Sequence, residues 1–369
     1  MKYYIIAGEA SGDLHGSNLI RELRKLDESA IIRCWGGDKM QQAGAELVKH
    51  YRDLAFMGFM EVLMNLRTIF RNLSFCKEDI LQFKPDTLIL IDYPGFNLRI
   101  ARWAKENGIK VIYYISPQVW AWKEGRVKMM KECIDKMIVI LPFEKDYYKD
   151  KWNWDVEYVG HPLVEVVNGQ RSMINVPKFS DKPIVALLPG SRKQEILKKL
   201  PVMLGVSKSF PGYQFIVAKA PGVEESFYSE LLQPYTNVST VSNQTYSLLL
   251  QAKAALVTSG TATLETALFG VPEVVCYKGS AISYQIAKRV IKVKYISLVN
   301  LIMNKLVVNE LIQAELTEKN LLHELNDLLT NKQRQEQLAR DYAALKLILG
   351  EGGHASANAA QSITGFLRS

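Results

Sequence analysis

The sequence predicts an α/β protein built from two doubly wound, Rossmann-like domains. Short apolar, β-rich segments alternate with amphipathic helical segments along most of the chain, as in sheets assembled from βαβ units. The 369 residues also exceed what one hydrophobic core usually supports. A hydrophobic content of 48% and a mean hydropathy of -0.04 are globular values, which exclude a disordered chain.

Strands are expected at short apolar segments in both halves. In the first half they are Tyr3–Ala7, Ile31–Trp35, Thr87–Ile91, Lys110–Tyr114 and Lys136–Ile140. In the second half they are Ile184–Leu188, Gln214–Ala218, Ala254–Thr258 and Glu273–Tyr277. From Glu310 onward the pattern is helical, and Gly350–Gly353 interrupt it before a last short helix.

A linker is expected where Gly160-His161-Pro162 opens an irregular, polar stretch that runs to about Pro183. The expected division is an N-terminal domain at 1–165, a C-terminal domain at 166–345 and a terminal helix at 346–369. Doubly wound sheets bind ligands at the carboxyl ends of their strands. We therefore expect the two domains to face each other across a cleft, with the chemistry in the loops that follow the strands.

Composition and motifs exclude several classes of protein. The four cysteines lie far apart, without the spacing of a zinc site or a disulfide framework. No apolar stretch is long enough to span a bilayer, and the N-terminal residues lack the pattern of a secretory signal, so a cytoplasmic protein is expected. Walker A, Gly-x-Ser-x-Gly and Asp-x-Asp sequences are all absent, which argues against ATPases, hydrolases and a metal-binding transferase motif.

Positive charge is concentrated in one segment. The net charge of +8 favours anionic partners such as nucleic acid, phosphorylated metabolites or an acidic membrane surface. Residues 274–309 contain six basic residues and no acidic one. Within them, residues 281–294 fit a helix lying on anionic lipid, or equally a helix packed on its sheet with lysines reaching the solvent.

Two loops of the first half are candidates for chemistry. Residues 8–13 contain Gly8, Glu9, Ser11, Gly12 and Asp13, and a loop of small residues at a helix start lets backbone amides approach a phosphate or sugar. The alternative is a tight turn capped by Ser11 or Asp13. The missing G-x-G-x-x-G spacing argues against NAD.

Asp92 stands at the tip of another expected strand, before Pro94 and Gly95, which restrict and turn the backbone. A carboxylate held with few conformers suits a general base. The alternative is an Asp that caps the turn or the following helix.

Two further loops in the second half suit a nucleoside diphosphate. Gly190 and Ser191 offer amides and a hydroxyl, and the guanidinium of Arg192 matches phosphate oxygens. The loop with Ser259, Gly260 and Thr261 also opens a helix, and places Glu265 one turn further, where its carboxylate suits a ribose diol. The alternative for this loop is a well-capped helix with a solvated Glu265.

The segment Phe56–Phe75 is strongly apolar and carries few charges. A core helix is one interpretation, and a surface for acyl chains is the other.

Together these motifs resemble the lipid A disaccharide synthase family. The matching segments, in order along the chain, are AGEASGD (7–13), GGDKMQQAG (36–44), FMGFMEVL (56–63), IDYPGFN (91–97), SPQVWAWKEGRV (116–127), LPFEKDYY (141–148), VGHPL (159–163), LLPGSRKQEI (187–196), TSGTATLE (258–265), YQIAKRVIKVKYISLVNL (284–301) and ELIQ (310–313). They cover most of the chain, and SPQVWAW and GEASGD are the most particular to the family.

The resemblance implies a GT-B glycosyltransferase whose last helix crosses back to the first domain. The implied reaction moves 2,3-diacylglucosamine from its UDP donor to the 6-hydroxyl of 2,3-diacylglucosamine 1-phosphate. It forms a β-1,6 bond with inversion and releases UDP, without a metal or any cofactor. Both substrates are acylated, so the enzyme is expected on the cytoplasmic face of the inner membrane, with no nucleic acid partner and with a homodimer as one expected assembly.

The resemblance also implies roles for residues. Asp92 matches the essential aspartate and is expected to be the general base. Donor binding is expected from Gly190, Ser191, Arg192, Ser259, Gly260, Thr261, Glu265, Asn300, Glu310 and Gln313. Acceptor binding is expected from Gly8, Glu9, Ser11, Gly12 and Asp13. Membrane or acyl contact is expected from Met57, Phe59, Met60, Leu63 and Phe70.

The sequence departs from the family at two positions near these residues. Gly95 stands where many members have a second aspartate, so Asp92 is expected to act without that neighbour. Val299 stands where members often have a proline. Two rival functions are another enzyme of the same fold, such as a UDP-sugar epimerase or an N-acetylglucosaminyl transferase, and a basic membrane- or RNA-binding protein.

Overall fold

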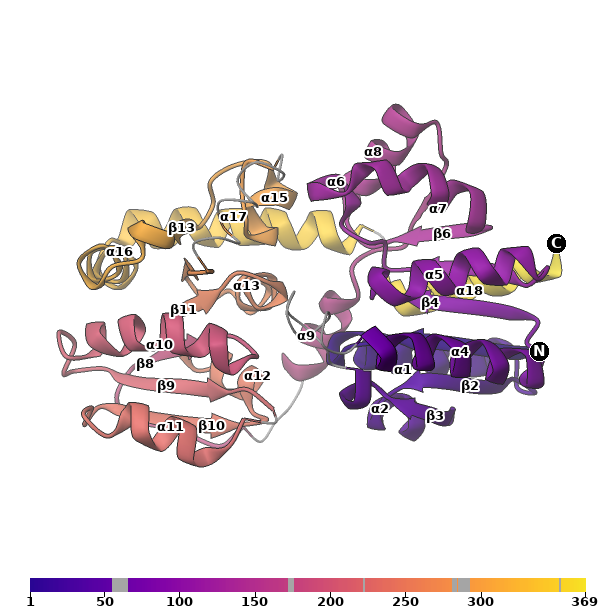
Figure 1. Cartoon of the computed structure of the whole chain (residues 1–369). Coiled ribbons are helices and arrows are strands. Elements are labelled where there is room, and N and C mark those ends of the chain that lie inside the picture. Colours follow the sequence, from indigo (N-terminus) through magenta and orange to yellow (C-terminus); the bar gives the residue numbers. More distant parts are fainter. Residues whose placement is uncertain (55–65, 172–175, 222, 281–283, 285–292, 352) are drawn as a thin grey trace. The chain divides into compact units, whose positions relative to one another are not determined.

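The computed structural model describes residues 1–54, 66–171, 176–221, 223–280, 284, 293–351 and 353–369. Contacts divide the chain into two compact units. The first consists of Met1–Pro162 and Leu349–Ser369, and the second of Leu163–Ile348. Each unit is a parallel sheet with helices on both faces (Figure 1).

The sheet of the first unit has the strand order β3-β2-β1-β4-β5-β6-β7. Its strands are β1 (Lys2–Ala7), β2 (Ile31–Gly36), β3 (Glu46–His50), β4 (Thr87–Ile91), β5 (Lys110–Tyr114), β6 (Lys136–Val139) and β7 (Glu157–Tyr158). Its helices are α1 (Ala10–Leu26), α2 (Asp38–Gln42), η1 (Tyr51–Leu54), α4 (Leu66–Phe83), α5 (Pro94–Glu106), α6 (Val119–Trp122), η2 (Glu124–Arg126), α7 (Val127–Cys133), α8 (Pro142–Trp152) and α18 (Ala355–Arg368). Every residue of β4 is buried, because helices cover both faces of the sheet.

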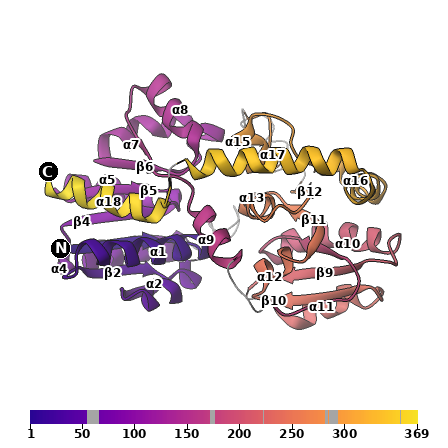
Figure 2. The same cartoon turned by 180° about the vertical axis from the view of Figure 1, so that it is seen from behind.

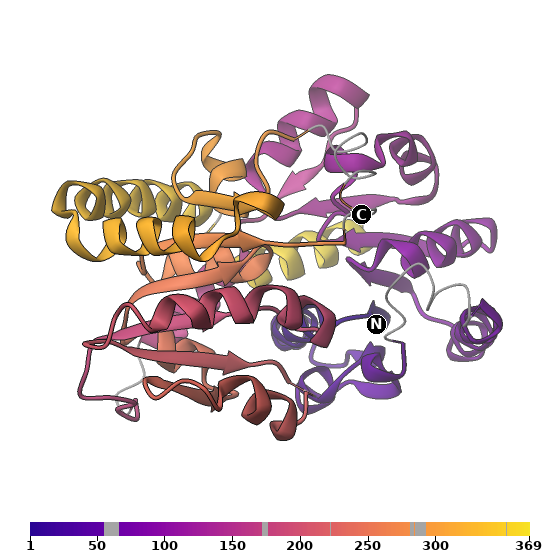
Figure 3. The ribbon, with the colours of Figure 1, turned by 60° about the vertical axis from the view of Figure 1, so that its left-hand side comes forward.

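The sheet of the second unit has the order β10-β9-β8-β11-β12-β13, and Figure 3 gives a further view of it. Its strands are β8 (Ile184–Leu188), β9 (Gln214–Lys219), β10 (Val238–Ser242), β11 (Ala252–Thr258), β12 (Glu273–Tyr277) and β13 (Asn309–Ile312). Its helices are α10 (Lys193–Ser207), α11 (Glu225–Leu232), α12 (Thr245–Leu249), α13 (Thr261–Leu268), α15 (Leu298–Met303), η3 (Gln313–Glu315) and α16 (Glu318–Thr330). Helices α9 (Pro162–Arg171) and α17 (Lys332–Gly350) carry the chain across the two boundaries between the units.

Two expectations about local structure are wrong. The stretch after His161 was expected to be irregular, but Pro162–Arg171 forms α9, with its proline at the first turn, where the missing N–H costs nothing. The chain from Glu310 was expected to be helical, but Asn309–Ile312 pairs with β12 as an edge strand. An edge strand buries less of each side chain and lacks a long apolar segment.

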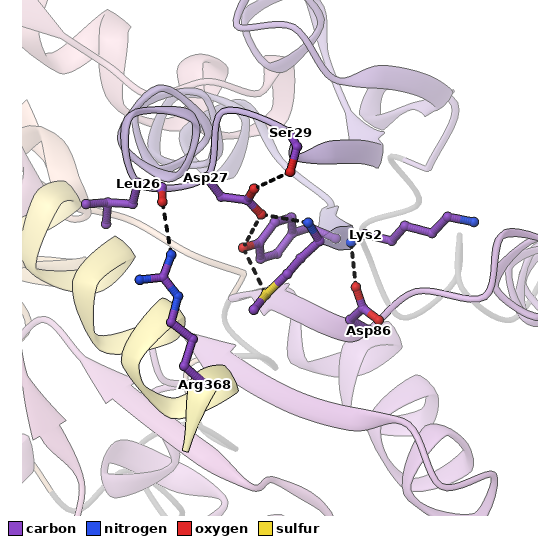
Figure 4. A network of polar contacts seen from close by, with 8 residues as sticks. Lys2, Leu26, Asp27, Ser29, Asp86 and Arg368 are labelled. Carbon is purple, nitrogen blue, oxygen red and sulfur yellow. Dashed lines mark hydrogen bonds and ion pairs between the residues drawn. The ribbon is translucent and has the colours of Figure 1, made fainter.

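Helix α18 packs on α1, and Figure 2 shows it in yellow beside that helix. A polar network at the start of β1 supports this contact (Figure 4). The guanidinium of Arg368 donates to the carbonyl oxygen of Leu26 at 3.1 Å. The next residue, Asp27, accepts from the N-terminal ammonium at 2.8 Å and from the Tyr3 hydroxyl at 3.1 Å. The C-terminal helix is thus fixed to the end of the first helix, next to the start of the first strand.

Candidate active site

In the first unit, β1 and β4 are neighbours at the centre of the sheet, and the chain builds outward from them in opposite directions. The loops after these strands therefore lie at the topological switch point, where doubly wound sheets bind ligands. One loop begins at Gly8, and the other begins at Asp92. The structure thus places the two candidate loops of the first half, which begin at Gly8 and Asp92, at the ends of adjacent strands.

The backbone at Asp92 is held in an uncommon conformation. Asp92 and Tyr93 both have left-handed backbones, with φ of 44° and 50°. The carbonyl oxygen of Asp92 accepts hydrogen bonds from Asn97 Nδ2 at 2.7 Å and from the Tyr113 hydroxyl at 2.5 Å. Such strain persists only where surrounding contacts enforce it, and it is common at functional sites.

Asp92 is not the N-cap residue of α5, because that position belongs to Tyr93. Burial and, to a smaller extent, the negative charge of Glu9 raise the pKa of Asp92 to about 7, against a backbone hydrogen bond with Tyr93 that lowers it. A carboxylate with a pKa near 7 is well matched to accepting a proton at neutral pH.

A second buried carboxyl group, Glu144, is influenced by the charge of Asp92. It accepts hydrogen bonds from the indole of Trp120 at 3.1 Å and from the backbone N–H of Leu141 at 3.0 Å. Burial, with a smaller contribution from the charge of Asp92, raises the pKa of Glu144 to about 8 against the opposing effect of these hydrogen bonds. It belongs to the LPFEKDYY segment, but sequence reasoning gave it no role.

Asp13 lies inside α1 and does not cap it. Its buried carboxylate accepts hydrogen bonds from the backbone N–H groups of Gly37, Lys39 and Met40, at 2.8, 3.2 and 3.0 Å. Asp13 therefore holds the start of α2, and this contact explains why the GEASGD and GGDKM segments occur together. Ser11 is partly exposed and Gly12 is buried in the same turn.

The second unit contains a cavity of about 360 Å³ at its own switch point, between β8 and β11. Its lining includes Gly190, Ser191, Arg192, Glu195, Thr258, Ser259, Gly260, Thr261 and Glu265. The backbone of Gly190 has φ of +122° and that of Gly260 has φ of +148°, conformations that disfavour any residue with a Cβ. Both predicted donor loops thus contribute to one cavity.

Glu265 accepts a hydrogen bond from the Tyr246 hydroxyl at 2.9 Å, and burial raises its pKa. Its partner and its place in the cavity lining argue against the alternative of a solvated Glu265. The Ser259 hydroxyl donates to the carbonyl oxygen of Ile296 at 2.8 Å and ties this loop to the segment before α15.

Asn300 and Glu310 hold the segment before α15 in place by hydrogen bonds. Asn300 is fully buried, and its amide oxygen accepts from the N–H groups of Val307 and Val308 at 2.8 and 2.9 Å. Its Nδ2 donates to Glu310 at 2.9 Å, and Glu310 also accepts from the N–H of Ser297 at 2.9 Å. Neither side chain lines the cavity between β8 and β11.

Gln313 begins η3 directly after β13, with φ of 55°. Its buried Nε2 has no hydrogen-bond partner among the described residues. A Cβ built on Gly279 would lie 3.4 Å from this nitrogen, so the side chain reaches the loop after β12. Gln313 does not line the cavity between β8 and β11.

The expected membrane contacts fall largely on residues outside those described. Met57, Phe59, Met60 and Leu63 belong to this undescribed part, as does most of 281–294. Phe70 lies on α4 with 62% of its surface exposed. In the described part of the chain, no helix is long and apolar enough to cross a membrane. The same residues contain no group of three or more His, Cys, Asp and Glu side chains suited to a metal ion.

The model of the lipid-A-disaccharide synthetase family matches residues 3–363. The chain belongs to this family. A lipid-A-disaccharide synthase of Syntrophus aciditrophicus is 40% identical over 370 residues, which cover 98% of this chain and 96% of the relative. One from Coxiella burnetii (strain Dugway 5J108-111) is 38% identical over 367 residues, covering 97% and 96%. Membership of the lipid-A-disaccharide synthetase family makes the chain a glycosyltransferase of lipid A biosynthesis.

Solved structures show the same fold at low identity. A UDP-GlcNAc 2-epimerase from Neisseria meningitidis has a TM-score of 0.67 and 13% identity, covering all of both chains. The glycotransferase of kitacinnamycin has a TM-score of 0.67 and 15% identity, covering 99% of each. These likenesses show the predicted GT-B type of fold and no more. The family match therefore decides against the rival epimerase and the rival binding protein.

Proposed function

We propose that this transferase joins two acylated glucosamines by an inverting displacement, with Asp92 as the general base. The donor is UDP-2,3-diacylglucosamine, and the acceptor is 2,3-diacylglucosamine 1-phosphate. The observation that carries this proposal is the raised pKa of Asp92, to about 7, at a switch-point loop whose backbone is strained.

The Asp92 carboxylate takes the proton of the acceptor's 6-hydroxyl as its oxygen attacks the anomeric carbon of the donor. The bond between that carbon and the β-phosphate oxygen breaks, and UDP leaves with the electron pair. Attack opposite the leaving group gives the β-1,6 bond with inversion. The proton then passes from Asp92 to solvent, which restores the base.

The donor's UDP occupies the cavity between β8 and β11. The backbone amides at the start of α13 and the guanidinium of Arg192 face the diphosphate, and they stabilise the charge that develops as UDP leaves. Glu265 binds the ribose diol. Because these groups supply the positive charge, the proposed reaction proceeds without a metal ion.

The acceptor binds at the loop that begins at Gly8, where Glu9 and Ser11 are partly exposed. Glu310 and Gln313 complete the donor side, and Asn300 holds Glu310. Both lipids lie in the cytoplasmic leaflet, so the protein works at that surface. Phe70, exposed on α4, supports an acyl or membrane contact there.

The test follows formation of the disaccharide 1-phosphate by mass spectrometry, with both lipids in detergent. Wild-type protein should form product with a β linkage by NMR, in the presence or absence of EDTA. Asp92→Asn should form none, although its circular dichroism is unchanged. Asp146→Asn, an exposed aspartate on α8, is the matched control and should keep wild-type activity. Product from folded Asp92→Asn at the wild-type rate would exclude Asp92 as the base.

A further inference from the structure

Lys199 is a cation buried inside the second unit. It lies on α10, and only 4% of its side chain is exposed. Its neighbours along the buried stripe of that helix, Ile196, Leu200 and Met203, are apolar. A buried ammonium group is costly unless anions or hydrogen-bond acceptors surround it. The position therefore calls for an explanation beyond packing.

The ammonium group of Lys199 lies directly beneath the two loops of the cavity. It donates a hydrogen bond to the hydroxyl of Thr258, which lines the cavity. A Cβ built on Gly190 would lie 3.4 Å from Lys199 Nζ, so the nitrogen is also against the backbone of the other loop. Lys199 thus lies against the end of β11 and the loop that follows β8.

Glu195 lies close to both Lys199 and Arg192. Glu195 Oε2 lies 4.0 Å from Lys199 Nζ, and Glu195 Oε1 lies 3.3 Å from Arg192 Nη1. One carboxylate is therefore shared by two cations at one wall of the cavity. Burial lowers the pKa of Lys199, whereas the charge of Glu195 raises it. An anion entering the cavity beside Thr258 and Gly190 would place negative charge next to this buried ammonium group and favour its charged form.

We infer that Lys199 is a positioning residue for the donor's diphosphate, acting through Thr258 and the Gly190 loop while Glu195 shares its charge between Lys199 and Arg192. This inference rests on the proposed function, because it takes the cavity to be the UDP site. Lys199 holds the two loops in the conformation that receives the phosphates. The positive charge of Lys199 attracts the diphosphate and not the nucleoside part of the donor.

The test compares the binding of UDP, UMP and uridine to the full chain by isothermal titration calorimetry. Lys199→Met keeps the length and packing of the side chain but removes its charge. It should weaken UDP binding about tenfold or more and leave uridine binding unchanged, because a unit charge acts on the phosphates alone. Lys198→Met, an exposed neighbour on the same helix, is the matched control and should bind all three like the wild type. Thr258→Val removes the hydroxyl that links Lys199 to the cavity and should weaken UDP binding in the same direction.

The outcomes separate this inference from the proposed function. If wild-type protein binds neither UDP nor uridine, the assignment of the cavity fails, and the inference fails with it. If wild-type protein binds UDP and Lys199→Met binds it equally well, only the inference is overturned. A matched loss of UDP and uridine binding in a folded Lys199→Met variant also overturns it, because that result indicates a purely structural lysine.

Discussion

The ring of Tyr93 lies against the backbone of Gly8, so closely that a Cβ at position 8 would be 2.3 Å from two of its ring carbons. No side chain fits in that space, and even alanine forces the ring to move. Tyr93 directly follows Asp92 in the strained turn after β4. The absence of a side chain at Gly8 therefore helps to hold the proposed base in place.

Gly8→Ala should lower kcat about 100-fold, since a displacement of about 1 Å at a catalytic group has effects of that size. The measurement is initial rate against donor concentration, with circular dichroism to show that the variant folds. Gly95→Ala is the control, because a Cβ there meets nothing within 4 Å and Gly95 lies within α5. That variant should keep its activity and gain about 0.4–1 kcal/mol in stability. Equal activity of Gly8→Ala and wild type would show that the Tyr93 ring does not position Asp92.

The pH dependence of kcat/KM should report Asp92. The base acts only when deprotonated, so the rate should rise with pH, reach half its maximum near pH 7 and stay level above it. Glu9→Gln should move this rise to lower pH, because the charge of Glu9 is the second cause of the raised pKa. A profile that is flat from pH 5 to 8, or one that Glu9→Gln moves upward, would contradict the assignment.

The same shift predicts the stability of Asp92→Asn. A carboxyl whose pKa is higher in the folded than in the unfolded chain favours folding at low pH, and this contribution is lost as pH rises from about 4 to about 7. Asp92→Asn should therefore have a higher Tm than wild type at pH 8, and the difference should disappear at pH 4. An inactive variant that is more stable at pH 8 is the expected result.

Sequence patterns predicted the interior strands and missed the edge strands. The four missed strands, β3, β7, β10 and β13, are the two edges of each sheet. Interior strands such as β4 and β8 are buried at every position and appear as continuous apolar segments. Edge strands such as β3 and β10 contain no fully buried residue and carry no such segment.

The candidate site was predicted where motifs follow strands, because parallel strands bring their carboxyl ends to one edge. Lys199 was missed because a lysine beside Lys198 in a helix is usually solvated. One signal was present in the sequence: Lys199 lies three residues after Ile196 and four before Met203, on the apolar stripe of α10. The network of Asn300 depends on contacts across a turn, which local patterns do not encode.

Asn300→Asp should destabilise the second unit and abolish activity. Both hydrogen atoms of the Asn300 amide are donated, to Val308 and Glu310, and an aspartate would replace them with a charge beside Glu310. The cost is about 2–4 kcal/mol for a buried group that loses its partners. Thermal unfolding measures it, and Asn326→Asp, at an exposed position on α16, is the control and is expected to match wild type. Unchanged Tm in Asn300→Asp would mean that this amide does not hold the segment before α15.

In contrast to the hydrogen-bonded amide of Asn300, Glu273 is a buried carboxyl group whose two side-chain oxygens have no hydrogen-bond partner among the described residues. Burial raises its pKa well above the ordinary value of 4.5. As pH rises above 4.5, the unfolded chain releases this proton while the folded chain retains it, so the stability that the group contributes at low pH is lost. Glu273→Met should therefore raise the free energy of unfolding at pH 8 by about 1–3 kcal/mol, and by less at pH 4.5.

Thermal unfolding of Glu273→Met at both pH values is the measurement, and Glu310→Gln is the contrast. Glu310 accepts hydrogen bonds from backbone N–H groups and from Asn300. The NH2 group of a glutamine at this position would face these N–H donors and lose hydrogen bonds, so Glu310→Gln should lower Tm. These two glutamates, in neighbouring strands of one sheet, should thus respond with opposite signs, because Glu310 has hydrogen-bond partners for its charge and Glu273 has none among the described residues. An equal gain from Glu273→Met at pH 4.5 and pH 8 would assign the effect to packing and not to the buried charge.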